Sequence, residues 1–478
     1  MSADLDPTRP EEPEQPRWLR AEEIIAAAAM AALGLITLAN VIVRYLTNYS
    51  FAFTEEYSIA LMVVVGAPIA VALGVAGSLA IWLGGLGVLS IPTSTYTGIA
   101  KYPLLAIPMF VLLGALFDRS GVASRLVNFT AALIGRRPGS LAAVTVIVAM
   151  FLGGISGSGP ANAAAVGGAM LGALSRAGYP KAFSASIIGA AAATDILIPP
   201  SIALIIYSVL VPQATVPALF AAGMIPGILA GVALLVPIFW LSRKHGFGLA
   251  EKDMARPPFW KSLREAIWGL MAPVLILGGM RAGWFTPTEA AVVAVVYGLF
   301  VGFVVYRTLT LRGVYDMLVE SAEITGIILI IVALASIFAW AGSTLGVFDH
   351  AARLLVGFGG NQYVVLALLI VLLIIIGMFL DGVSTFLILL PLLMPIANGY
   401  GWDPVWFGIL ITMKVAIGQF TPPMAVNLMV SCRIAGIPME ATLRWVFPLI
   451  LAMFVVLILL VIVPDTALWL PRYLGYVK

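Results

Sequence analysis

Long apolar stretches make up most of this chain, and short polar breaks separate them. Clear examples are residues 24–45, 57–89, 217–242, 287–306 and 444–463. A run of about 20 apolar residues can cross a bilayer as a helix, and the pattern lacks the strict alternation expected of membrane β-strands. It predicts an all-α polytopic membrane protein with roughly eleven to thirteen membrane helices.

Glycines, small polar residues and prolines interrupt this pattern at particular points. The first interruption is GGISGSGPANAAAVGG at residues 153–168, and two double prolines follow at Pro199–Pro200 and Pro422–Pro423. A double proline unwinds a helix, because each ring removes a backbone donor and clashes with the preceding turn. The freed carbonyls, beside Ser, Thr and Asn oxygens, suit a small cation. Close helix packing is the alternative reading of the glycines, but packing needs no double proline.

The interruptions recur at a nearly constant spacing. The matching landmarks are Ser158, Pro180 and Pro199 in the first half and Asp381, Pro404 and Pro422 in the second. Their intervals are 22 and 19 residues in the first half and 23 and 18 in the second. Upstream, FDRSGVASRLVNF at 117–129 parallels GSTLGVFDHAARLL at 342–355. An internal duplication is therefore predicted, and in transporters such repeats place substrate and ion sites where their interrupted helices meet.

Composition and charge exclude several classes of function. The chain is 62% hydrophobic and 10% charged, whereas a soluble domain has about 25% charged residues. The net charge of +3 is spread over loops, which gives no basis for a nucleic-acid partner. One cysteine, Cys432, excludes an internal disulfide. The chain has no G-x-x-x-x-G-K-[ST] motif, so an ion gradient is expected to drive any transport.

The basic residues predict the orientation in the membrane. Residues 1–20 are polar and Pro-rich, which is typical of a disordered tail, and they lack the basic start of a signal peptide. Arg17 and Arg20 place this tail in the cytoplasm by the positive-inside rule. The same rule places there the polar segment 243–264, which contains six lysines and arginines.

Six stretches resemble one family. They are IPMFVLLGALFDRSG, GGISGSGPANAAAVGG, IPPSIALIIYSVL, FTPTEAAVVAVVYGL, GMFLDGVSTFLILLPLLMPI and IGQFTPPMAVNLMV. In this order, across about residues 67–465, they resemble the large membrane (permease) subunit of TRAP (tripartite ATP-independent periplasmic) transporters. The resemblance implies an inverted-repeat ion-transporter-type fold, with a scaffold domain and an elevator-type transport domain that carries two re-entrant helical hairpins.

The resemblance also assigns domains. The first repeat is expected at 67–245 with its hairpin at 142–175, and the second at 266–478 with its hairpin at 375–400. A cytoplasmic linker, 246–265, joins them. Residues 21–66 form a small-subunit-like helix and connection, because NVIVRYLTNYSFAFTEEYSIALMVVVG at 40–66 resembles the start of the family's small membrane subunit. Whether a separate small membrane subunit is also a partner stays open.

The function that the resemblance implies is transport rather than catalysis. The chain is expected to be a multi-pass protein of the bacterial inner membrane that imports an organic acid, such as a C4-dicarboxylate, by symport with Na⁺. A periplasmic substrate-binding protein would deliver this organic anion. Many family members carry an acid where this chain has Asn162, whose amide oxygen can still bind a cation.

The predicted sites lie at the hairpins and the double prolines. The predicted substrate-binding residues are Ser156, Gly157, Ser158, Asn162, Ser384, Thr385 and Asn427. The predicted Na⁺ ligands are Ser156, Gly157, Asn162, Pro199, Asp381, Gly382, Thr385, Thr421 and Pro422. Asp381 is an acid within an apolar stretch and thus a functional candidate, and its alternative role is a helix cap. Asn427 has an interhelical hydrogen bond as its alternative role.

Other polar residues have two interpretations each. Asp195 is a cation ligand or faces a polar vestibule. Lys414 snorkels, pairs with an acid, or attracts the anionic substrate. Ser201 and Thr421 are helix caps or ligands, and Glu289 is expected to complete a cap with Thr286.

Two rival functions account for parts of the same pattern. The first is an ion-coupled organic-anion transporter of similar inverted-repeat fold that needs no binding protein. The second is an intramembrane serine protease, because GISG contains Ser156. Protease chemistry needs a base within hydrogen-bond reach, but His245 and His350 lie beside polar loops and Lys414 is more than 250 residues away. The protease is therefore disfavoured.

Overall fold

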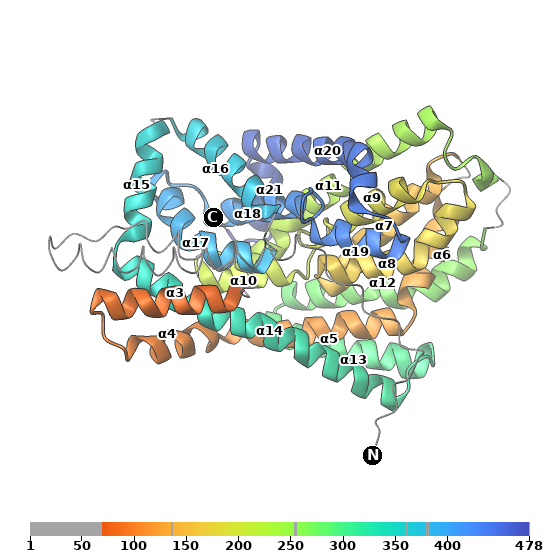
Figure 1. Ribbon diagram of the computed structural model, residues 1–478. Coiled ribbons are helices and arrows are strands. Elements are labelled where there is room, and N and C mark those ends of the chain that lie inside the picture. Colours follow the sequence, from red (N-terminus) through yellow and green to blue (C-terminus); the bar gives the residue numbers. More distant parts are fainter. Residues whose placement is uncertain are drawn as a thin grey trace, which may run out of the picture. The chain divides into compact units, whose positions relative to one another are not determined.

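The structure is a computed structural model, and it describes residues 69–134, 137–252, 256–359, 361–378, 380 and 382–477. All regular structure in these ranges is helical (Figure 1). Helices satisfy every backbone donor and acceptor within one segment, as an apolar environment requires. The predicted all-α fold is therefore confirmed for the described part of the chain. The predicted tail and the small-subunit-like stretch, residues 1–66, lie outside it.

The helices follow the apolar stretches closely. Those of the first half are α3 (Ile69–Gly84), α4 (Ser90–Ile99), the 3₁₀ turn η1 (Tyr102–Leu105), α5 (Ala106–Arg119), α6 (Val122–Leu133), α7 (Ser140–Ser156), α8 (Gly159–Arg176), α9 (Lys181–Ala192), α10 (Ile202–Leu210), α11 (Val216–His245) and the 3₁₀ turn η2 (Leu249–Lys252). Those of the second half are α12 (Phe259–Arg281), α13 (Pro287–Phe300), the π-turn η3 (Val301–Val305), α14 (Leu311–Thr344), α15 (Val347–Gly359), α16 (Gln362–Gly377), α17 (Gly382–Gly399), α18 (Pro404–Gly418), α19 (Val426–Ala435), the 3₁₀ turn η4 (Met439–Thr442), α20 (Leu443–Ile462) and α21 (Asp465–Tyr473).

The predicted total of eleven to thirteen membrane helices includes the span at 24–45, which lies outside the described residues. Within the described ranges, seven helices have the length and apolar composition of a span, and seven further apolar helices have only 10–17 residues. Within the described ranges, glycine and proline breaks divide some apolar stretches into short helices. One example is the stretch from α7 to α8, which breaks at Gly157.

The duplication is visible in where the helices begin. The first residues of α6, α7, α8, α9 and α10 precede those of α15, α16, α17, α18 and α19 by 222 to 225 residues. This interval agrees with the spacing of the sequence landmarks. Both double prolines fall between helices, because α9 ends at Ala192 before α10 begins at Ile202, and α18 ends at Gly418 before α19 begins at Val426. The breaks predicted from the double prolines are therefore present.

The chain divides into two compact units that do not coincide with the repeats. Among the described residues, the first contains 69–95 together with 334–347, and the second contains those of 96–333 and 348–477. Within the first unit, α3 and the end of α14 share a small core of Ala80, Ile81, Ile337 and Ala341. Within the second unit, α19 packs against both α8 and α9, so elements of the two repeats interleave there (Figure 1).

The polar segment that follows α11 is anchored rather than loose. Glu251, which is 2% exposed, accepts hydrogen bonds from Tyr179 Oη at 2.6 Å and from the Leu141 backbone N–H at 3.1 Å. Arg256 lies 3.8 Å from the same carboxylate and donates to the carbonyls of Ala131 and Ile134 at the end of α6. The predicted linker 246–265 thus holds the end of α6 and the start of α7, and its last residues already belong to α12.

Glu251→Gln is expected to make the melting temperature less dependent on pH. Burial raises the pKa of the Glu251 carboxyl, although hydrogen bonds from Tyr179 and Leu141 oppose this rise. The folded state therefore holds the proton more tightly than the unfolded state, and stability falls as pH rises above 4.5, the ordinary pKa of a glutamate carboxyl, by at most about 1.4 kcal/mol per pH unit. Fluorimetric melting in detergent from pH 5 to 8 measures this, with exposed Glu440→Gln as the control. If the melting temperature fell equally steeply with pH in the wild type and in Glu251→Gln, this prediction would be contradicted.

Candidate functional site

The first predicted hairpin corresponds to α7 and α8, which pack against each other. The two helices cover 140–176, close to the predicted 142–175. The break between them is Gly157, whose φ of 60° and ψ of 19° lie in the left-handed region that glycine adopts without strain. Ser158 is extended, and Pro160 occupies the first turn of α8, where its missing N–H costs nothing.

The tip of this hairpin abuts the first double-proline break. A Cβ on Gly157 would lie 2.5 Å from the carbonyl oxygen of Pro200 and 3.2 Å from the amide nitrogen of Ile202. Ser201 in this break is a helix cap, because its Oγ accepts the Leu204 N–H at 3.4 Å and donates to the Ile196 carbonyl at 2.7 Å. The backbone of the break therefore faces the hairpin tip, with the start of α10 beside it.

The same hairpin also meets the second half of the chain. A Cβ on Gly159 would lie 2.7 Å from Gln419 Oε1 and 2.7 Å from both side-chain atoms of the Asn427 amide. Asn427 Nδ2 donates to Gln419 Oε1 at 3.1 Å. On its other side, Gln419 Nε2 lies 3.7 Å from the Cβ position of Gly382. Gln419 therefore links the starts of α8 and α17. Sequence reasoning did not select it, although it precedes Thr421 by two residues and the double proline by three.

Four helix N-termini gather around this point. They are the starts of α8 and α10, beside Gly159 and Gly157, and the starts of α17 and α19, beside Gln419. A helix N-terminus carries a partial positive charge and backbone N–H groups without helical partners. Such ends bind carboxylates and phosphates without any basic side chain. The arrangement can therefore hold an organic anion.

Several predicted ligands are buried with unsatisfied polar atoms. In the described part of the chain, Ser156 Oγ, Asn162 Oδ1, Ser384 Oγ and Asn427 Oδ1 are buried and make no hydrogen bond. Asn162 donates only from Nδ2, to the Ala149 carbonyl at 2.9 Å. Because buried polar atoms normally have partners, these oxygens are suited to a ligand.

Asp195 adds a carboxylate to this group. It is fully buried, and both of its oxygens lack a hydrogen bond in the described part of the chain. A Cβ on Gly153 would lie 2.6 Å from Asp195 Cβ and 3.6 Å from Asn162 Nδ2, so the two side chains flank one glycine of the hairpin. A buried, unpaired carboxylate is costly unless a cation or a proton neutralises it. Sequence reasoning noted Asp195 but did not place it at the hairpin.

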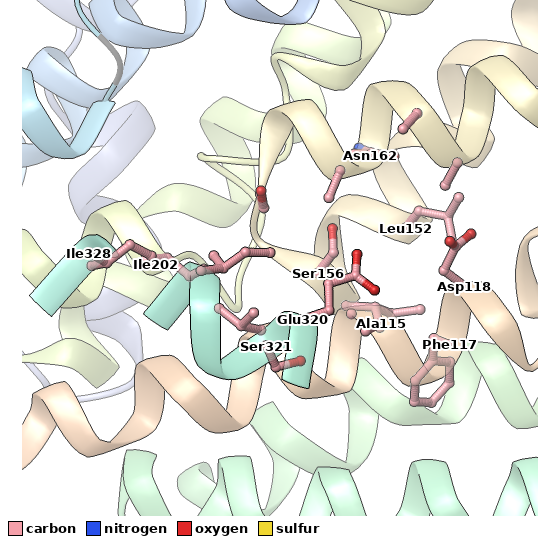
Figure 2. Close-up of a pocket in the computed structure, with 18 residues that line it drawn as sticks. Ala115, Phe117, Asp118, Leu152, Ser156, Asn162, Ile202, Glu320, Ser321 and Ile328 are labelled. Carbon is pink, nitrogen blue, oxygen red and sulfur yellow. The ribbon is translucent and has the colours of Figure 1, made fainter. Parts of the chain in front are cut away.

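A pocket of about 200 Å³ reaches the hairpin from one side. Figure 2 shows Ser156 and Asn162 on one wall, and Asp118 of α5 with Glu320 and Ser321 of α14 among the others. Glu320 also forms a salt bridge of 2.9 Å with Arg119. Arg119 compensates the charge of Glu320, so Asp118 is the wall carboxylate that favours cations over anions, and within the described ranges it forms no salt bridge. The sequence pattern did not single out either acid.

The remaining predicted residues that the structure describes lie in the two double-proline breaks and in α17. Pro199 and Pro422 lie in the two breaks. Thr421 Oγ1 donates to the Ile417 carbonyl at 2.6 Å, so it bonds the last turn of the preceding helix, α18. Thr385 is buried in α17, and Gly382 begins that helix. Asp381 lies outside the described residues. The second predicted hairpin, 375–400, contains α17 and the end of α16, and its tip is not described.

Two further expectations have clear outcomes. Lys414 is fully buried, with Nζ 5.3 Å from the centre of the Phe454 ring. The snorkelling interpretation is therefore wrong, because α18 is surrounded by other helices along this face.

Glu289 does complete a capping box with Thr286, as predicted. The rival protease is not supported by contacts of Ser156, whose Oγ has no hydrogen-bond partner within the described ranges.

Comparisons with known proteins agree on one family. Residues 57–466 match the family described as tripartite ATP-independent periplasmic transporter, DctM component. Three curated relatives are each 38% identical. They are the isethionate TRAP transporter permease protein DctMQ of Oleidesulfovibrio alaskensis (85% of this chain, 64% of the relative), the sialic acid TRAP transporter large permease protein SiaM of Vibrio cholerae (79% and 88%) and the C4-dicarboxylate TRAP transporter large permease protein DctM of Pseudomonas aeruginosa (84% and 94%). The chain thus spans 64% of the length of the first of these.

Two solved structures share the fold. The YdaH transporter of Alcanivorax borkumensis has a TM-score of 0.57 at 14% identity and covers 87% of this chain and 99% of its own. MtrF of Neisseria gonorrhoeae has a TM-score of 0.57 at 15% identity and covers 86% and 98%. At this identity the likeness is evidence of fold alone, and it agrees with the helical transporter fold expected from the sequence.

Proposed function

Because the chain belongs to the tripartite ATP-independent periplasmic transporter family, as its DctM component, we propose that it imports an organic acid by sodium-coupled secondary transport. One observation carries this proposal. Helix N-termini from both halves of the chain gather at the tip of the first hairpin, around Gly157, Gly159 and Gln419. Interrupted helices whose N-termini point at an anionic group are a common transporter solution.

The substrate carboxylate would bind to backbone N–H groups at these helix starts. Ser158, Asn427 and the two serines Ser156 and Ser384 would add hydroxyl and amide groups to the seat. A carboxylate is the expected chemical class, because N-terminal dipoles and unpartnered backbone N–H groups prefer small anionic groups. The relatives named for C4-dicarboxylate, sialic acid and isethionate all point to anionic substrates.

The coupling Na⁺ would sit on the part of the same hairpin that carries Asn162, beside Asp195. Asn162 Oδ1 and the Asp195 carboxylate are buried oxygens without partners, and oxygen is the ligand that hard cations select. The pocket walled by Asp118 and Glu320 leads to this part of the hairpin and would concentrate cations there. In the second half, Asp381, Gly382, Thr385, Thr421 and Pro422 remain the proposed ligands of a repeat-related site.

The transport cycle would be of the elevator type, in the bacterial inner membrane. The hairpins and the double-proline breaks would move together with bound substrate and Na⁺, while the rest of the chain forms the scaffold. A periplasmic substrate-binding protein would deliver the anion, and a small membrane subunit would accompany the chain. The relative named DctMQ motivates the question of whether residues 21–66 replace part of that subunit.

Uptake in proteoliposomes tests the proposal. We expect vesicles that hold this protein, with its binding protein and small subunit, to accumulate at least one of radiolabelled succinate, N-acetylneuraminate and isethionate when Na⁺ is high outside. Replacing Na⁺ by choline should reduce accumulation to the level of empty vesicles, since no nucleotide motor is present.

Leaving out Na⁺ or the binding protein distinguishes the proposed mechanism from its alternatives. Undiminished uptake in choline would refute sodium coupling. Undiminished uptake without the binding protein would instead favour the ion-coupled transporter that works alone.

A further inference from the structure

Helices α11 and α20 are of membrane-spanning length and pack against each other (Figure 1). A groove of about 430 Å³ is lined by residues of both. Its lining is apolar and includes Pro237 and Trp240 of α11 and Pro448, Leu451 and Val455 of α20. Trp240, Leu451 and Val455 are each more than half exposed, at 55%, 59% and 60%. An exposed apolar groove on membrane-spanning helices is a surface for lipid chains rather than for water.

Each wall of the groove ends in a basic residue. On α11 the stripe Ala233, Pro237, Trp240 continues to Lys244, and on α20 the stripe Val455, Leu451, Pro448 continues to Arg444. Steps of three and four residues keep each stripe on one helix face. The two ends are adjacent, because the rings of His245 and Trp445 have centroids 5.2 Å apart. Both cations therefore lie at the same end of the groove, one turn beyond its lining.

The two basic side chains are available to a ligand. Both are exposed, and within the described ranges neither forms a salt bridge. Lys244 Nζ lies 4.8 Å from the centre of the Trp240 ring, and Arg444 Cζ lies 4.2 Å from that of Trp445, so aromatic faces orient them. Arg243 adds a third positive charge at this end, and Glu440, one turn before Arg444, is the acid nearest to them in sequence.

We propose that this groove binds an anionic phospholipid, with one acyl chain along the apolar lining and the phosphate between Lys244 and Arg444. A free anion would leave the apolar groove unfilled. A lipid without net charge would leave the positive charges of Lys244 and Arg444 uncompensated. Charge and shape together therefore select an anionic amphiphile. The segment that carries Lys244 is the one that the positive-inside rule assigns to the cytoplasmic leaflet. The site is separate from the transport site and does not depend on it.

Native mass spectrometry of the delipidated protein in detergent tests this proposal. The probes are dioleoyl phosphatidylglycerol and dioleoyl phosphatidylcholine, which have the same acyl chains and differ in headgroup charge. We expect the wild-type protein to retain phosphatidylglycerol preferentially. The double variant Lys244→Ala/Arg444→Ala should lose roughly 25-fold of that preference, since each basic residue near an anionic lipid surface contributes about five-fold. The control Lys261→Ala/Arg264→Ala removes two basic residues from the first turns of α12 and should keep the preference.

Two further arms test the lipid chain and the headgroup separately. Ala452→Trp fills the groove without touching the charges and should reduce phosphatidylglycerol retention, while the exposed substitution Val292→Trp on α13 should not. Glycerol 3-phosphate in excess should not displace the lipid. If the wild-type protein retained both lipids equally, that measurement alone would overturn the proposal. Displacement by glycerol 3-phosphate would show a free-anion site and would overturn it as well.

Discussion

Gly157→Ala is expected to reduce uptake roughly ten-fold or more while the protein still folds. Alanine is strained at a φ of 60° by roughly 1–2 kcal/mol, and its Cβ would lie 2.5 Å from the Pro200 carbonyl oxygen. That neighbour is backbone and cannot rotate away, so the hairpin tip or the double-proline break must shift. A binding constellation loses its function when displaced by about 1 Å.

Gly168→Ala is the matched control. It lies in α8 of the same hairpin, and an added Cβ there has no heavy atom within 4 Å. It should keep wild-type uptake and melt at the same or a higher temperature, since alanine favours a helix over glycine. Proteoliposome uptake and fluorimetric melting measure both variants. Wild-type uptake by Gly157→Ala would show that the close approach of tip and break is not needed for transport.

Asp195→Asn is expected to leave the stability of the sodium-free protein unchanged or higher and to weaken its response to Na⁺. Asparagine has nearly the same shape and removes a buried charge whose oxygens have no partner within the described ranges. The sodium-free protein should therefore be as stable as the wild type or more stable. The apparent affinity for Na⁺ should fall roughly ten-fold or more, because ligand charge sets the strength of an oxygen site.

The measurement is the rise in melting temperature on adding Na⁺. A ligand at 100 times its Kd stabilises the folded state by about 2.7 kcal/mol, so a wild-type shift should be readily visible and the Asp195→Asn shift should be small. Asp349→Asn, which removes an exposed carboxylate from α15, should respond like the wild type. An unchanged sodium response in Asp195→Asn would remove this residue from the cation site, whether or not uptake is impaired.

The local features of the fold could be predicted from sequence because they depend on neighbouring residues. Gly157 breaks the first hairpin through its own backbone, and the double prolines end helices through their rings. The predicted boundaries of the first hairpin therefore differ from the observed ones by two residues at most. The number of spans was less predictable, because an apolar stretch has the same pattern whether its helix crosses the membrane or stops partway.

The composition of the site depends on contacts that periodicity does not encode. Gln419 lies 260 residues after Gly159 in the chain, and no local pattern predicts that the two touch. Asp195 faces Gly153 only because α9 packs against α7. Lys414 is buried because α18 is covered by other helices, and the uniformly apolar α18 has no polar face that would predict which side is covered.

The interleaving of the two halves also constrains how the protein is made. Ser431 of α19 donates a hydrogen bond of 2.9 Å to the carbonyl of Ala185 in α9, across 246 residues of chain. At 5–20 residues per second, a ribosome needs roughly 10 to 50 s to synthesise that interval. Throughout that time the first hairpin is made without α19, the helix that packs against its α8. The contact between α8 and α19 therefore forms only after most of the second half of the chain has been synthesised.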